Sequence, residues 1–245
     1  MSKTLIQWTV VHWKKLWREL WFKTANVSAD LTWVEPWVYR VNIIVEWKKY
    51  SWAGTFLGGS GVFEVHIFDF DEEIYGFEVD VYLIYKLRDN KKFDSLEELK
   101  KTISYDVQIL KEKKVLAMTF WTFDYVHKWH EFYLWEAKKY ADELITVVAK
   151  DVSVLHFKWS MPKFSEDKRL KDVLALWIAD KVIFWDDKDY YKCIKIYKPS
   201  VICLWYDQKS ASEWLQKFLD SSGISLNIIR LKPFKENEFK SSLLK

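Results

Sequence analysis

Two histidines stand three residues apart in the segment TFWTFDYVHKWH, directly after an apolar run. His127 and His130 fall at the predicted start of an amphipathic helix over about residues 129–140. Imidazoles at this spacing could bind a metal ion, although the spacing offers no third ligand. A helix start also presents free backbone N–H groups and the positive end of the helix dipole, which bind phosphate. The pair therefore indicates either a nucleotide phosphate site or a metal site.

The elements around this pair alternate between strand and helix. The apolar run before it predicts a strand at 115–120, and a second strand follows the helix at 144–149. Such alternation is typical of a parallel α/β sheet with a Rossmann-like nucleotide-binding layout. The remaining predicted elements are a helix near 166–177, a strand at 181–184, a helix near 189–197, a strand at 201–204, a helix opened by the capping box Ser210-x-x-Glu213, and a strand at 225–229.

The first 110 residues have a different character and predict a β-rich domain. β-Branched and aromatic residues predict strands at 38–45, 63–70 and 78–85, with a polar turn at 71–74. Ser95-x-x-Glu98 predicts the start of a helix that runs to about Lys111, with Leu96, Leu99, Ile103 and Val107 on one side. The charged run Lys111-Glu112-Lys113-Lys114 predicts the boundary between the two domains.

Composition excludes several classes of protein. A net charge of +3 over 245 residues gives no sign of nucleic-acid binding. No apolar run approaches the roughly 18 residues of a membrane span, and MSKTLIQW lacks the apolar core of a signal peptide. Cys193 and Cys203 are isolated thiols, which favours a reducing cytoplasm and buried structural roles for both. The sequence does not predict an oligomeric state.

The segment around the histidine pair resembles the signature of the cytidylyltransferase-like nucleotidyltransferases, G-T-F-D-x-x-H-x-G-H. Every fixed position matches except the two glycines, which are Trp121 and Trp129 here. KVIFWDD and VICLWYDQ resemble two further segments of that family, with Trp185 and Trp205 at glycine positions. The form L-G-Y-D-Q and the closing Lys240-Ser241-Ser242 are similar to the archaeal-type FAD synthetases within it. This resemblance covers residues 114–245.

The first domain resembles the bacterial riboflavin kinases. With glycine written for tryptophan, residues 8–27 become GTVVHGKKLGRELGFKTANV, which is similar to that family's N-terminal motif. Residues 63–108 match the rest of the family and contain no tryptophan, and Trp37 and Trp52 again stand at glycine positions. Lys23 departs from the proline that the family usually has. The resemblance implies a small closed β-barrel with a C-terminal helix over residues 1–111.

The kinase resemblance implies a first set of site residues. Thr24 and Asn26 match the residues that hold Mg²⁺ and the ATP phosphates. Glu64 matches the general base that acts on the ribityl hydroxyl, a role that suits a carboxylate. Arg88 and Phe93 are expected to border the flavin. The alternatives are an exposed strand residue for Glu64, a surface charge for Arg88 and a core ring for Phe93.

The transferase resemblance implies a second set. His127 and His130 are expected to stabilise charge on the α-phosphate as pyrophosphate departs. Arg169 resembles a phosphate-facing arginine, with a surface charge as its alternative. The other expected nucleotide or phosphate contacts are Thr122 and Phe123 of the nucleotide-binding turn, Asp124, Lys128, Trp129, Asp207, Ser241 and Ser242.

Tryptophan and glycine are both abnormal in number. The chain has 16 tryptophans and 6 glycines, whereas average usage predicts roughly 17 glycines. A phosphate-binding turn needs a backbone that approaches closely and often has φ > 0, which only glycine adopts at little cost. We therefore expect that UGA codons for glycine have been read as tryptophan. By our count 14 positions qualify: Trp8, Trp13, Trp17, Trp21, Trp33, Trp37, Trp47, Trp52, Trp121, Trp129, Trp159, Trp177, Trp185 and Trp205.

Of these fourteen, Trp33, Trp47, Trp159 and Trp177 have the weakest assignments, while Trp135 and Trp214 lie in helical patterns and are not assigned. The alternative for residues 12–27 is a true amphipathic helix lined with tryptophan, because Trp13, Trp17 and Trp21 recur at helical spacing.

Together the resemblances imply a bifunctional enzyme of two domains, 1–111 and 114–245, with riboflavin, FMN and ATP as substrates and Mg²⁺ as cofactor. The first domain would form FMN and the second FAD. One alternative gives the second domain another acceptor in a CTP-dependent reaction. The other is a non-catalytic, tryptophan-rich module that presents aromatic platforms to sugars or single-stranded nucleic acid.

Overall fold

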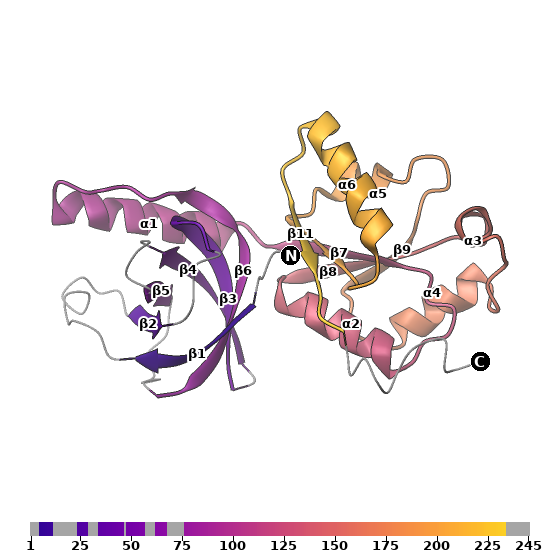
Figure 1. The fold of residues 1–245 in the computed structure, drawn as a ribbon, viewed down its shortest axis with the longest axis horizontal. Coiled ribbons are helices and arrows are strands. Elements are labelled where there is room, and N and C mark those ends of the chain that lie inside the picture. The colour runs from indigo at the N-terminus through magenta and orange to yellow at the C-terminus, as the bar shows by residue number, and fades with distance from the viewer. Residues whose placement is uncertain are drawn as a thin grey trace. The chain divides into compact units, whose positions relative to one another are not determined.

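The chain forms two compact units, which are described separately (Figure 1). The computed structural model describes residues 5–11, 24–28, 34–46, 48–56, 62–67 and 76–233. One unit lies within Lys3–Lys114, and the other begins at Val115. None of the described helices combines the length and the apolar character that crossing a bilayer requires.

The first unit is a closed antiparallel barrel of six strands in the order β1-β2-β5-β4-β3-β6. Pairing of β1 with β6 closes the barrel. Val41, Phe63, Val65 and Val81 lie in its fully buried core. This confirms the small closed barrel that the resemblance implied. The strands are β1 Leu5–Val11, β2 Thr24–Ser28, β3 Trp37–Val45, β4 Lys48–Phe56, β5 Val62–Ile67 and β6 Glu78–Asp89.

The barrel corrects two sequence expectations and leaves a third untested. β6 runs four residues beyond the predicted end because it pairs with β1 at one end and with β3 along its whole length. Residues 24–27 lie in β2, so the alternative of a helix over 12–27 is wrong there, and 12–23 lie outside the described residues. The predicted turn at 71–74 also lies outside them.

Helix α1, Leu96–Glu112, follows the barrel as predicted. Ser95 caps it, since its hydroxyl accepts a hydrogen bond from the backbone N–H of Glu98 at 3.1 Å. Two arginines anchor the helix to the barrel strands. Arg40 Nη1 of β3 donates to the carbonyl of Leu110 at 2.7 Å, and Arg88 of β6 forms an ion pair with Asp106.

The second unit is a parallel five-stranded sheet in the order β11-β10-β7-β8-β9, which confirms the predicted Rossmann-like layout. Figure 1 shows α5 and α6 over one face and α2 and α4 over the other. The strands are β7 Leu116–Trp121, β8 Glu143–Val148, β9 Lys181–Phe184, β10 Val201–Leu204 and β11 Asn227–Arg230, and the helices are α2 Lys128–Lys139, α3 Asp151–Lys158, α4 Glu166–Leu174, α5 Lys192–Tyr197 and α6 Lys209–Ser222.

Most predicted elements of this unit are confirmed to within a few residues, with three exceptions. Helix α3 was not predicted at all, since its buried side chains are only Ser153 and Val154. Helix α4 ends at Leu174, before the left-handed residue Trp177. The Ser210 capping box is wrong because α6 begins at Lys209, and its N-cap position is Gln208, two residues before Ser210, with no side-chain cap.

The strand order puts a topological switch point between β7 and β10. The chain proceeds from β7 to β8 and β9 on one side and returns to β10 and β11 on the other. In open α/β sheets, ligands bind at such a point, outside the carboxyl ends of the strands. The histidine segment follows β7 and the WYDQ segment follows β10, so this edge brings the two predicted motifs together.

Candidate functional site

The turn after β7 connects the sheet to the start of α2. Thr122 and Phe123 are buried, and Phe123 has a φ of 55°, an uncommon conformation for a bulky residue. His127 is the N-cap of α2, since its Nδ1 accepts a hydrogen bond from the N–H of Trp129 at 3.3 Å. Lys128 is the first residue of the helix and is exposed. The sequence thus places a strained turn and a helix start side by side.

The two histidines face each other with ring centroids 4.3 Å apart. Burial, together with the charges of His127 and Lys158, lowers the pKa of His130 to about 3. Burial also lowers the pKa of His127, while Glu131 opposes that shift. Both imidazoles are therefore neutral near pH 7, and each can donate one N–H to a phosphate oxygen.

Three indoles fill the space above this helix start. The ring of Trp129 lies 4.4 Å from that of Trp205 and 5.8 Å from that of Trp121. Trp205 is completely buried, and its Nε1 has no hydrogen-bond partner among the described residues. An unpaired buried N–H costs about 1–3 kcal/mol. The rings thus crowd the start of α2, where the backbone N–H groups of residues 129–131 already donate to His127.

Charged residues surround the same edge. Desolvation lowers the pKa of Lys158, at the end of α3, and the carboxylates of Asp124 and Asp207 partly offset that shift. The ammonium group and the two carboxylates therefore lie within electrostatic reach of one another. Asp124 also accepts hydrogen bonds from the N–H groups of Lys163 and Phe164, at 2.9 and 3.0 Å. Asp124 therefore holds the loop before α4, in addition to its expected place beside the nucleotide.

Arg169 is completely buried, so its alternative as a surface charge is wrong. Its guanidinium donates to the carbonyls of Thr122 and Phe164 and to the carboxylate of Asp151. These bonds use donors that the resemblance assigned to phosphate. In this structure Arg169 holds the turn after β7 through the carbonyl of Thr122.

In the barrel, Glu64 of β5 and Asn26 of β2 are direct register partners, and Thr24 is the partner of His66. Glu64 is half-buried rather than an exposed strand residue, and desolvation raises its pKa. The strand pairing therefore brings the predicted general base to the level of a predicted Mg²⁺ ligand. The side chains of Thr24 and Asn26 lie outside the described residues.

Arg88 does not stand free beside a flavin. Its Nε and Nη2 donate to the carboxylate of Asp106, at 2.8 Å for the shortest contact, and its Nη1 donates to the carbonyl of Asp89. Phe93 is half-buried, with the ammonium of Lys91 5.7 Å from its ring centroid. Arg88 therefore ties α1 to the barrel, and the flavin contacts of both residues stay predictions.

The remaining expectations fall at the limits of the described chain. Ser241 and Ser242 lie outside it. Within the described residues, no three His, Cys, Asp or Glu side chains form a group that could hold a metal ion. Cys193 and Cys203 are buried free thiols, as predicted.

Sequence reasoning missed two residues at this site. Lys158 carries no periodic or motif signal, and Gln208 ends the VICLWYDQ segment but was assigned no role there. Gln208 links the strands by accepting from the N–H of Trp205 and donating to the carbonyl of Phe120. Only the meeting of β7, α3 and β10 reveals them.

Comparison with known proteins agrees with this architecture. Residues 118–245, just over half of the chain, match the cytidylyltransferase-like family, and the chain belongs to that family. Residues 2–114 match the riboflavin kinase family. The predicted pair of domains is therefore confirmed in kind.

Similarity to individual proteins narrows the class. An FAD synthase of Ferroglobus placidus is 38% identical over 130 residues, which cover 53% of this chain and 83% of that protein. An FAD synthase of Archaeoglobus profundus is 39% identical over 121 residues, covering 49% and 77%. Among solved structures, riboflavin kinase from Trypanosoma brucei is 23% identical, with a TM-score of 0.35, and covers 44% of this chain and 74% of that one. The two FAD synthase matches show that the C-terminal half is homologous to archaeal FAD synthases.

Proposed function

We propose that this chain converts riboflavin to FAD in two ATP-dependent steps. The observation that carries the proposal is the fusion of a riboflavin kinase domain to a domain 38% identical to an FAD synthase. FMN, the product of the first reaction, is the substrate of the second.

The first step belongs to the barrel. The terminal ribityl hydroxyl of riboflavin attacks the γ-phosphorus of ATP, its proton passes to Glu64, and ADP leaves. The raised pKa of Glu64 favours proton acceptance as the hydroxyl reacts. Thr24 and Asn26 offer oxygen ligands of the kind that Mg²⁺ prefers, and Mg²⁺ commonly needs only one or two protein ligands beside the phosphates. When bound, the ion neutralises phosphate charge.

The second step belongs to the parallel sheet. A phosphate oxygen of FMN attacks the α-phosphorus of ATP, and the bond to the bridging oxygen breaks so that pyrophosphate leaves. His127 and His130 donate hydrogen bonds to the charge that develops on the phosphates, and the positive end of the α2 dipole adds to this stabilisation.

We also propose that the working enzyme has glycine at 121, 129 and 205. The crowded indoles at these positions and the unpaired Nε1 of Trp205 support this proposal, because a chain that carries them leaves little room for a triphosphate. Peptide masses from the source organism test it directly. Glycine masses at 121 and 129 are expected, and tryptophan there would end the recoding hypothesis.

An assay with full-length chain in the glycine form tests the two reactions. Riboflavin with ATP should give FMN, and FMN with ATP should give FAD and pyrophosphate, both separated by chromatography. CTP should not replace ATP in the second reaction. Failure to form FAD from FMN and ATP, or a preference for CTP, would contradict the proposed second activity.

A further inference from the structure

Three aromatic side chains from three separate segments converge beside the transferase site. Phe157 ends α3, Tyr190 lies in the loop between β9 and α5, and Trp214 lies on α6. The ring of Phe157 is 5.2 Å from that of Tyr190 and 5.9 Å from that of Trp214. We call these three residues the aromatic platform.

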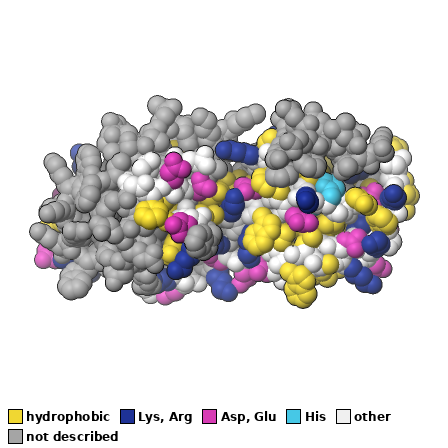
Figure 2. Space-filling view, turned by 90° about the horizontal axis from the view of Figure 1, so that it is seen from below, with side chains coloured by type: hydrophobic (Ala, Val, Ile, Leu, Met, Phe, Trp, Pro, Cys, Tyr) yellow, Lys and Arg dark blue, Asp and Glu magenta, His cyan; other side chains and the backbone are white. Residues whose placement is uncertain are grey.

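Exposure alone does not distinguish the platform. In the part of Figure 2 that is not grey, hydrophobic side chains lie among charged ones, which is ordinary for a protein surface. The platform differs because its rings meet one another while staying accessible. Phe157 is 38% exposed, Trp214 is 53% exposed and Tyr190 is half-buried.

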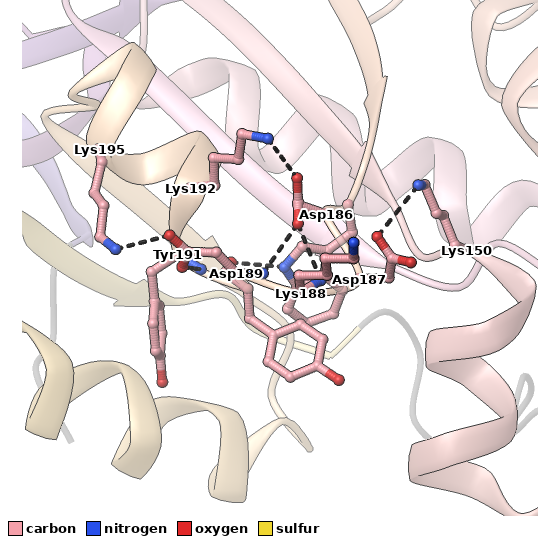
Figure 3. A network of polar contacts seen from close by, with 10 residues as sticks. Lys150, Asp186, Asp187, Lys188, Asp189, Tyr191, Lys192 and Lys195 are labelled. Carbon is pink, nitrogen blue, oxygen red and sulfur yellow. Dashed lines mark hydrogen bonds and ion pairs between the residues drawn. The ribbon is translucent and has the colours of Figure 1, made fainter.

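The loop that carries Tyr190 is held firmly (Figure 3). Asp186 accepts hydrogen bonds from the N–H groups of Lys188 and Asp189, both at 3.0 Å, and from Lys192 Nζ at 2.7 Å. The next residue, Tyr191, stacks on Phe218 with ring centroids 3.9 Å apart. The platform is therefore preorganised, which reduces the entropy lost when a planar ligand binds.

The Tyr191 hydroxyl also donates to the carbonyl of Trp214 at 3.2 Å, so the loop and α6 are joined. This bond fixes two of the three platform segments to each other.

The platform adjoins the nucleotide site through the chain itself. Lys158 follows Phe157 directly, and its charge acts on His130, Asp124 and Asp207. A ligand lying on the rings would therefore have the cationic Lys158, the next residue after Phe157, as a partner for an anionic group. Its planar part must be aromatic, and its other end must be anionic.

We propose that the aromatic platform binds the isoalloxazine ring of FMN and directs its phosphate toward Lys158 and the histidine pair. The assignment rests on the proposed function.

Trp185, whose position qualifies as a glycine, packs against Phe157 and Tyr190, with ring centroids 6.4 and 5.5 Å away, and its Nε1 donates to the Tyr190 carbonyl at 2.7 Å. The proposal for the glycine form therefore rests on the contacts of Phe157 with Tyr190 and Trp214 and on the bond from Tyr191 to Trp214. Trp214 lies within the helix α6, where glycine would be unfavourable. We therefore take it as a true tryptophan, whose indole is present in the glycine form as well.

Kinetics of the full-length glycine form, with Trp214→Ala and Tyr190→Ala as variants, tests the platform. Each variant should raise KM for FMN about tenfold, as expected for one lost aromatic contact, and leave KM for ATP unchanged. Trp135→Ala is the matched control, because Trp135 is an equally exposed helical tryptophan at 57% and should change neither constant. The unchanged KM for ATP in the FAD-forming reaction reports folding of the second unit, and the riboflavin kinase rate, which should stay constant, reports the amount of intact barrel.

The outcomes separate the platform from the function. If both variants form FAD with an unchanged KM for FMN, the platform proposal is wrong while the proposed function stands. If instead the KM for ATP rises, the rings bind adenine, and the platform proposal is again wrong. Absence of FAD in the unsubstituted chain contradicts the proposed function. In that case, calorimetric titration with FMN tests the platform separately. The proposal requires that FMN binds outside the kinase domain, and that this binding is weaker in Trp214→Ala than in Trp135→Ala.

Discussion

His130 illustrates how a buried titratable side chain links the site to stability. It is 4% exposed, and aromatic rings of Trp121, Phe123 and Trp129 lie around it. A neutral imidazole avoids the cost of a buried charge and can still donate a hydrogen bond. The same burial has a measurable consequence in acid.

The stability of the tryptophan form should depend on pH through His130. Its folded pKa is lowered from 6.5 to about 3, so below pH 6.5 the unfolded chain takes up a proton that the folded chain does not. The free energy of unfolding should therefore fall by about 2 kcal/mol between pH 7.5 and pH 5 from this group. Urea unfolding at both pH values measures it. The decrease should be smaller in His130→Gln, and an equal decrease in both proteins would contradict the assignment.

Arg169 is the second residue whose removal should be costly. Arg169→Ala leaves the carboxylate of Asp151 and the carbonyls of Thr122 and Phe164 without their donor. We expect a loss of about 3–5 kcal/mol in the free energy of unfolding, measured in urea. Lys168→Ala is the control, since its exposed pair with Asp172 should contribute about 0.5 kcal/mol or less. Similar losses in the two variants would mean that Arg169 does not hold the turn.

At the scale of elements, two tryptophans end structural segments in a conformation suited to glycine. Trp159 is the C-cap of α3 with a φ of 57°, and Trp177 follows α4 with a φ of 56°. Their side chains are 90% and 91% exposed, so no packing offsets the left-handed backbone. Glycine is the residue that such helix ends favour.

Replacing either tryptophan by glycine should stabilise the protein. Trp159→Gly and Trp177→Gly should each raise the free energy of unfolding by about 1 kcal/mol, because the left-handed conformation costs most residues that much. Lys198→Gly should have a similar effect, since Lys198 is a left-handed C-cap without an indole. Urea unfolding measures all three.

The matched control lies inside a helix. Trp135→Gly within α2 should lower the free energy of unfolding by roughly 0.5 kcal/mol. A gain in this variant, or a loss at 159 and 177, would refute the backbone explanation.

For the whole molecule, the two units separate the two proposed reactions. The expected general base Glu64 lies in the barrel, and His127 and His130 lie in the parallel sheet unit. The groups proposed for each reaction therefore lie within a single unit. Substitution in one unit should be silent in the other.

Two variants of the full-length glycine form test this separation. Glu64→Gln should lower FMN formation from riboflavin at least 100-fold, as loss of a general base does, and leave FAD formation from added FMN intact. His130→Ala should have the opposite pattern, so that FMN accumulates. Chromatography of flavins measures both. Loss of both activities in either variant would show that the units depend on each other.

Much of the fold was predictable because buried helices and strands have recognisable patterns of apolar residues in the sequence. Parallel strands buried on both faces are continuous apolar runs, and β7, β8 and β10 were found for that reason. The Ser95 cap was found because its side chain acts within one turn of the chain. Strands β1, β2 and β4 were not predicted as strands, and a helical spacing of tryptophans obscured the segment before β2.

The sequence by itself determined the local elements, the two families and the segments that carry the histidine pair and Glu64. Those signals arise from neighbours along the chain. Tertiary structure alone decided that Arg169 is buried against the turn after β7 and that Arg88 pairs with Asp106. It also decided that Phe157 contacts both Tyr190 and Trp214. The reason is physical: the environment of a side chain depends on the elements that pack over it, and those elements lie far away in sequence.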